Sequence, residues 1–91
     1  MPAFVRTATV LVGPEYDDEI RRTLAAALLR AGARRIWGWR GMAGSQEIER
    51  AWYLVGWRLL RIHAETYAGI TLHGPRAIVD TIAATMRAAA T

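Results

Sequence analysis

The pattern of apolar and polar residues divides the first third of the chain into a strand and a helix. Residues 4–12 are rich in β-branched and apolar side chains, which predicts a strand that ends at Gly13 and Pro14. Apolar residues then recur every three or four positions from Ile20 to Ala31, which predicts a helix. Gly32 follows directly, as expected of a residue that ends a helix.

The middle of the chain is compatible with two interpretations. Residues 36–40 predict a second strand, and residues 41–45 predict a turn. Ser45 as an N-cap, followed by an apolar stripe at helical spacing, favours a helix over residues 46–56 and a short strand over residues 58–62. Alternatively, residues 50–62 form one long strand, because Trp, Tyr and Val favour strands. We prefer the helix, since the capping signals are local and mutually consistent.

The last third predicts a strand and a final helix. Residues 66–73 alternate between apolar and polar, and Pro75 suits the first position of a helix that carries a stripe from Ile78 to Met86. We therefore expect a single α/β domain over residues 1–91, with a small sheet of three to four strands and two or three helices. The strands would run mainly parallel if helices connect them. The expected order is β-α-β-α-β-β-α, or β-α-β-β-β-α if residues 50–62 are one strand.

Composition narrows the function classes further. The chain has no cysteine, so disulfides and thiolate metal sites are excluded, and we expect neither a metal nor a cofactor. It has no apolar run of membrane-spanning length, which favours a cytoplasmic protein without a membrane partner. The net charge is +4, and all 12 basic residues are arginine. Arginine suits forked contacts to phosphate or carboxylate, although a GC-rich genome would produce the same bias.

The first candidate site lies where the expected parallel strands end. Ligands of open α/β sheets bind at that edge, and a glycine turn that opens a helix presents free N–H groups to an anion. Arginine, serine and histidine side chains nearby would add further donors. The expected ligand-binding residues are Arg40, Gly41, Gly44, Ser45, His73 and Arg76.

The order of motifs along the chain supports this site through a resemblance. The segments GPEYDDEI, GMAGSQEIERAW, GWRLLRIHAET and GPRAIV follow one another between the expected strands and helices. This order is similar to the Rossmann-like nucleotide-binding family that includes lysine-decarboxylase-like cytokinin-activating enzymes and DNA-processing protein A. The resemblance implies a Gly-x-x-Gly turn made by Gly41 and Gly44. The chain differs from that group at Pro14 and Gln46, where a small hydroxyl residue and an acid are common.

The second candidate site is one face of the expected sheet. Its interface residues would be Arg35, Trp37, Trp39 and Tyr67, and the threonines of the neighbouring strands would share the face. Aromatic side chains interleaved with arginine can stack on bases and hold phosphates. The same residue types anchor protein interfaces, and they also suit a core covered by helices. These three hypotheses stay open at the level of sequence.

The third candidate is Pro2, which would become an N-terminal secondary amine if Met1 were removed. The opening MPAFVRTATV resembles the tautomerase superfamily, which implies a proline general base and a binding arginine such as Arg6 or Arg40.

Nothing else in the chain suggests catalysis. We therefore expect a non-catalytic binding protein for an anionic ligand, either a nucleotide or nucleic-acid phosphate. The alternatives are a homo-oligomeric or partner-binding accessory protein and a tautomerase-like enzyme.

Overall fold

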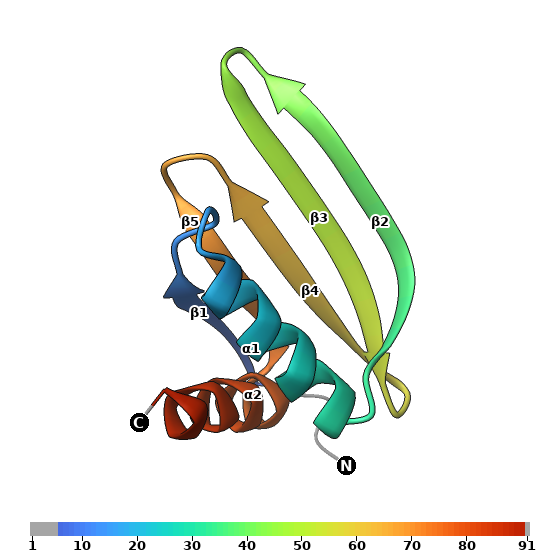
Figure 1. Ribbon diagram of the computed structural model, residues 1–91. Coiled ribbons are helices and arrows are strands. Elements are labelled where there is room, and N and C mark those ends of the chain that lie inside the picture. Colours follow the sequence, from blue (N-terminus) through green and yellow to red (C-terminus); the bar gives the residue numbers. More distant parts are fainter. Residues whose placement is uncertain (1–5, 91) are drawn as a thin grey trace.

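Five strands form one antiparallel sheet, and two helices pack on one of its faces (Figure 1). The computed structural model describes residues 6–90. The strand order across the sheet is β1-β5-β4-β3-β2. The elements are β1 (Thr7–Gly13), α1 (Asp18–Arg30), β2 (Arg34–Ala43), β3 (Gln46–Val55), β4 (Arg58–Glu65), β5 (Gly69–Pro75) and α2 (Arg76–Ala89).

The prediction of a mainly parallel sheet of three to four strands is wrong. All four pairs of neighbouring strands are antiparallel. After α1, strands β2 to β5 follow one another through short turns, and β1 pairs with β5 at the edge opposite β2. Parallel neighbours need a long crossover connection, and no helix interrupts the chain between β2 and β5. The Rossmann-like order of strands and helices is therefore absent.

The helix predicted over residues 46–56 is also wrong, because this segment is β3. Two-residue turns bracket it, at Gly44-Ser45 and at Gly56-Trp57. Gly44 and Gly56 each have a φ of 65°, and the residue after each glycine has negative φ, which is the pattern of a type II′ hairpin turn. The alternative of one strand over residues 50–62 is wrong as well, since the turn at Gly56 separates β3 from β4.

The two predicted helices at the ends of the chain are confirmed, with small shifts of their first residues. Asp17 is the N-cap of α1, and its carboxylate accepts hydrogen bonds from the backbone N–H groups of Glu19 and Ile20. Pro75 is the N-cap of α2 rather than its first helical residue. Both helices bury their apolar stripes against the sheet. The central buried side chains are Leu24, Leu28, Leu60, Ile62, Ile70, Leu72, Val79, Ile82 and Met86.

The β2–β3 hairpin extends beyond the part of the sheet that the helices cover (Figure 1). None of the ten residues of β2 is buried. The register of β2 against β3 shifts between Arg35 and Trp37, so Ile36 is an extra residue in a β-bulge.

Neither α1 nor α2 is long and apolar enough to cross a membrane.

Candidate functional site

The sheet face opposite the helices carries two rows of side chains that cross all five strands. Directly paired residues of antiparallel strands point to the same face, so the register defines each row. The first row is Thr9, His73, Arg61, Trp52 and Trp37. The second row is Leu11, Thr71, His63, Arg50 and Trp39. We call these ten residues the open face, because both helices pack on the other side of the sheet.

The end of the open face on β2 and β3 is aromatic. Trp37 and Trp39 are 51% and 46% exposed, and Trp37 pairs directly with the half-buried Trp52. The indole of Trp39 lies over Gly41, where an added Cβ would stand 2.5 Å from the ring atom Cζ2. Glycine at this position therefore leaves room for the ring to lie along the sheet. The three indoles make this end of the open face apolar, and those of Trp37 and Trp39 have accessible surface.

The centre of the open face is basic. The guanidinium of Arg61 lies 5.7 Å from the centre of the Trp52 ring, which is a cation–π contact. The Nε atom of Arg61 is buried and has no hydrogen-bond partner. Nε of Arg50 donates a hydrogen bond to Nδ1 of His63 at 3.2 Å, and most of its guanidinium stays free to bind an acceptor.

The opposite end of the open face is polar in the first row, whereas the second row ends at the exposed Leu11. The hydroxyl of Thr9 and Nδ1 of His73 form a hydrogen bond of 2.6 Å, which fixes the imidazole on the sheet. Glu65 borders the second row, and its carboxylate lies 3.9 Å from Nε2 of His63. The ten residues of the open face include two arginines and no acid. The face therefore carries positive charge between an aromatic end and a polar end.

The structure brings together part of the interface group predicted from the sequence. Trp37 and Trp39 lie on the open face, in line with His73 and Thr71 respectively. The bulge at Ile36 turns Arg35 to the helix side, where it pairs with Tyr53. Tyr67 lies in the turn between β4 and β5, away from both rows.

The structure does not bring together the predicted anion-binding residues. Arg40, Gly41, Gly44 and Ser45 lie at or near the tip of the β2–β3 hairpin, whereas Arg76 begins α2 directly after β5. These places are at opposite ends of the sheet, because β3 and β5 run in the same direction. His73 lies on the open face.

The local basis of the predicted anion site is also missing. No helix begins after Ser45, so the glycine turn cannot present helical N–H groups to an anion. Pro2, the predicted general base of the tautomerase-like alternative, lies outside the described residues.

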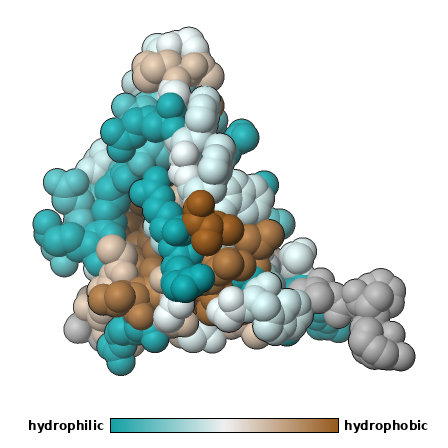
Figure 2. All heavy atoms as spheres, turned by 90° about the vertical axis from the view of Figure 1, so that its right-hand side faces the viewer, coloured by the Kyte–Doolittle hydropathy of each residue, from teal (hydrophilic) through white to brown (hydrophobic). Residues whose placement is uncertain are grey.

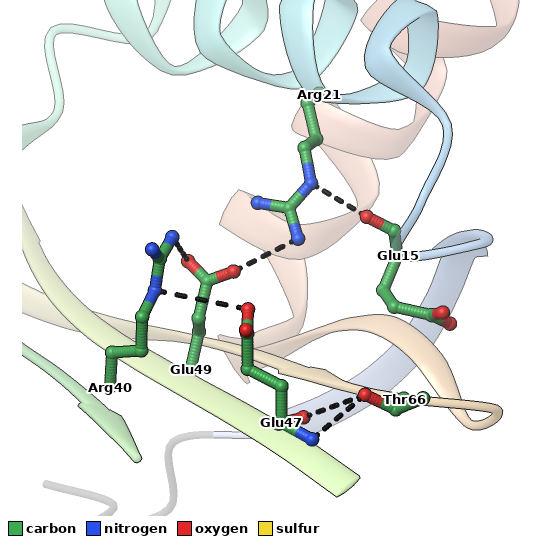
Figure 3. A network of polar contacts seen from close by, with 6 residues as sticks. All are labelled: Glu15, Arg21, Arg40, Glu47, Glu49 and Thr66. Atoms are coloured by element: carbon green, nitrogen blue, oxygen red, sulfur yellow. Dashed lines mark hydrogen bonds and ion pairs between the residues drawn. The ribbon is translucent and has the colours of Figure 1, made fainter. Parts of the chain in front are cut away.

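Arg40 takes part in a polar network on the helix side of the sheet (Figure 3). Its Nη2 lies 3.2 Å from Oε2 of Glu49, and its Nε lies 3.9 Å from a carboxylate oxygen of Glu47. Nη2 of Arg21, which projects from α1, donates to Oε1 of Glu49 at 3.0 Å. Nε of Arg21 donates to the backbone carbonyl of Glu15 at 2.7 Å. The network therefore ties α1 to the β2–β3 hairpin.

The electrostatics of this network keep its members charged. Burial by itself raises the pKa of Glu49, but hydrogen bonds and charge from Arg40 and Arg21 outweigh burial, so the pKa is lowered below its usual value. The hydrogen bond and the charge of Glu49 raise the pKa of Arg40. Glu49 is therefore an anion at neutral pH, already matched by two cations. Its place between them suits a structural ion pair.

No family model, curated protein or solved structure matches this chain. The geometry of its own residues therefore carries the functional argument. Within residues 6–90, no three His, Asp or Glu side chains stand close enough together to hold a metal ion. The open face is the feature with the most distinctive chemistry.

Sequence reasoning missed five members of the open face, including Leu11. Arg50 and Trp52 were assigned to a helix, and Arg61 and His63 were not recognised as neighbours of Trp37 and Trp39. One signal could have found these four. Gly-Ser at 44–45 is a typical two-residue hairpin loop, Gly56 suits the first position of a second such loop, and the ten residues between the two loops include Trp, Tyr, Val and Leu.

Proposed function

We propose that this protein binds single-stranded nucleic acid on the open face. The observation that carries the proposal is the pair of rows in which three indoles continue directly into two arginines on a sheet face that no helix covers. Proteins that bind single strands combine aromatic side chains, on which bases stack, with positive charge that follows the phosphates. The open face supplies both in adjacent positions.

The parts of the open face have distinct roles in this proposal. Trp37 and Trp39 are two residues apart on the same strand face, so they offer stacking surfaces to two successive bases. Arg50 and Arg61 lie one and two strands further in, where their guanidiniums contact phosphate or a base edge.

The exposed indoles favour a single strand over a duplex. Stacking on them needs bases whose ring surfaces are accessible, and bases inside a duplex are stacked on one another. Unpaired bases can be splayed out and stacked on aromatic side chains. The proposal therefore expects a single-stranded oligonucleotide to bind more tightly than the same sequence in a duplex.

Charge makes this proposal stronger than self-association through the same face. In a symmetric dimer, an identical patch of each subunit meets its copy. A contact centred on the open face would bring Arg50 and Arg61 against the same residues of a second copy and remove water from all of them. A polyanion neutralises these charges instead.

Two matched tryptophan variants test the proposal. Trp39→Ala removes a stacking surface, and we expect it to weaken binding of a fluorescein-labelled 12-nucleotide single strand by about 1–3 kcal/mol, roughly 5- to 150-fold. Trp57→Ala is the control, because Trp57 is exposed in the turn between β3 and β4, outside both rows. Fluorescence anisotropy titrations measure both affinities.

The outcomes separate the alternatives. Absence of oligonucleotide binding by the wild-type protein, or equal losses for Trp39→Ala and Trp57→Ala, would contradict the proposal. Light scattering on the same samples measures the mass in solution. A mass that falls with Trp39→Ala, in a protein that binds no oligonucleotide, would instead support self-association through the open face.

A further inference from the structure

The helix side of the molecule contains a cleft separate from the open face. It lies between α1 and the neighbouring parts of β2 and β3, and its volume is about 470 Å³. Pockets for small molecules typically have about 300–1,000 Å³. Figure 2 shows the molecule from the β2 edge. Hydrophobic atoms lie in the middle of this view, with hydrophilic atoms above them and to the left.

The wall and floor of the cleft are apolar. Leu24 and Leu28 of α1 form one wall, and Ile62 and Ile70 of the central strands form the floor. These four residues belong to the buried core and are each at most 9% exposed, so they form a small apolar patch at the bottom of the cleft. Such a surface favours the apolar body of a ligand over water.

The rim of the cleft has an excess of positive charge. Arg21, Arg35, Arg40 and Arg50 line it together with a single acid, Glu49. The side chain of Arg50 belongs to the open face. Arg21 and Arg40 are already paired with Glu49. Among the described residues, the guanidinium of Arg35 has no ion-pair partner. Arg35 is therefore the cation of the rim that can accept a new anion.

Glycine at position 38 sets the place of this cation. The guanidinium of Arg35 lies so close over Gly38 that a Cβ added there would collide with it. The β-bulge at Ile36 is what turns Arg35 to this side of the sheet. The local backbone thus directs a free arginine over the cleft, at the end of an apolar surface.

We propose that the cleft binds a small organic monoanion, with its acid group at Arg35 and its apolar body on Leu24, Leu28 and Ile62. A carboxylate matches the forked donors of a guanidinium. A single acid group is expected, because Arg21 and Arg40 are already paired with Glu49 and Arg35 has no ion-pair partner among the described residues. This inference goes beyond nucleic-acid binding, since Arg35, Leu24, Leu28 and Ile62 lie on the helix side of the sheet, although Trp39 and Arg50 of the open face also line the cleft.

Displacement of a fluorescent probe tests the ligand class. The dye 1-anilinonaphthalene-8-sulfonate is bound to the wild-type protein, and octanoate, octyl phosphate, 1-octanol and octylammonium are added separately as competitors. We expect octanoate to displace the dye at the lowest concentration and octylammonium at the highest. Equal potency of octanoate and 1-octanol, or stronger displacement by octylammonium, would overturn the proposal.

Two neighbouring arginines provide a matched pair of variants. Arg35 points to the cleft, whereas Arg34 pairs with Leu54 and points to the other side. We expect Arg35→Gln to weaken octanoate binding roughly tenfold, as the loss of one charge-assisted hydrogen bond does. Arg34→Gln should leave it unchanged within about twofold. Equal losses in the two variants would contradict the role of Arg35.

A third variant tests the place of the ligand independently. Ala25 lines the cleft from an exposed position of α1, so Ala25→Trp fills the cleft without disturbing the core. We expect this variant to lose octanoate binding and to keep its affinity for the single-stranded oligonucleotide. Octanoate binding that persists in Ala25→Trp places the anion elsewhere and overturns the proposal, whatever the outcome for the open face.

Discussion

The two faces of β4 differ sharply, although they are made by alternating residues of one short strand. Leu60, Ile62 and Ala64 point toward the helices and are buried. Leu59, Arg61 and His63 point the other way and are half-buried or exposed. The helices cover the first group, whereas the second group is shielded only by its neighbours on the sheet.

This difference shows which residues the fold itself explains. Burial of the helix-side residues provides the main hydrophobic stabilisation, so their apolar character follows from packing. The row from Trp37 to His73 receives no such cover, and a stable sheet does not require arginine and tryptophan at its centre. The proposed binding of a single-stranded polyanion would account for the aromatic and basic character of the open face.

The largest expected effect comes from truncating the two leucines that stand next to each other on β4. Leu60 is fully buried and Leu59 is 49% exposed. Leu60→Ala should lower the free energy of unfolding by about 2–5 kcal/mol, because it leaves a cavity in the core. Leu59→Ala should change it by less than about 0.5 kcal/mol, as is usual at the surface. Urea unfolding followed by tryptophan fluorescence measures both values.

Similar losses of unfolding free energy in Leu60→Ala and Leu59→Ala would contradict the difference in burial between the two faces. A large loss for Leu59→Ala would mean that something covers the open face of the isolated protein, with a second copy as the first candidate. The solution mass of the wild-type protein, measured under the same conditions, would then show whether the protein is a dimer.

A smaller effect is expected at the polar network that holds α1 to the β2–β3 hairpin. Because Arg40 and Arg21 lower the pKa of Glu49, its carboxylate stabilises the fold above the unfolded pKa of about 4.3. This contribution is lost as the pH falls through the lower pKa of the folded state. Glu49→Gln should therefore cost about 1 kcal/mol at pH 7 and progressively less in acid.

One outcome of a pH series would contradict the stabilising role of the Glu49 charge. Urea unfolding of the wild-type protein and of Glu49→Gln is measured between pH 7 and pH 2.5. If the difference between them stayed constant over this range, the charge of Glu49 would not be what stabilises the network.

The sequence predicted the elements at the two ends of the chain better than those in its middle. The helix from Ile20 to Ala31 repeats its apolar residues for three turns and has an acidic N-cap region, so local patterns were sufficient. The segment 46–56 has apolar residues at both helical and alternating spacing. There the pairing with β2 and β4 decided the structure, and pairing between distant residues is not visible in a local pattern.

The candidate site shows the same limit. Alternation correctly grouped Trp37 with Trp39, but it also included Arg35, because a one-residue bulge cannot be read from residue types at this position. The antiparallel order of the strands places Arg50 and Arg61 next to the indoles, and a mainly parallel sheet gave no reason to expect this. Which side chains meet on the open face is thus a property of the register.

The four tryptophans allow the most direct test of the open face. Each indole N–H gives its own signal in a ¹H–¹⁵N correlation spectrum, and single Trp→Phe variants assign the four signals. On titration with a single-stranded 12-nucleotide oligonucleotide, we expect the signals of Trp37, Trp39 and Trp52 to shift and that of Trp57 to stay in place. A shift of the Trp57 signal alone, or no shift at all, would contradict nucleic-acid binding on the open face.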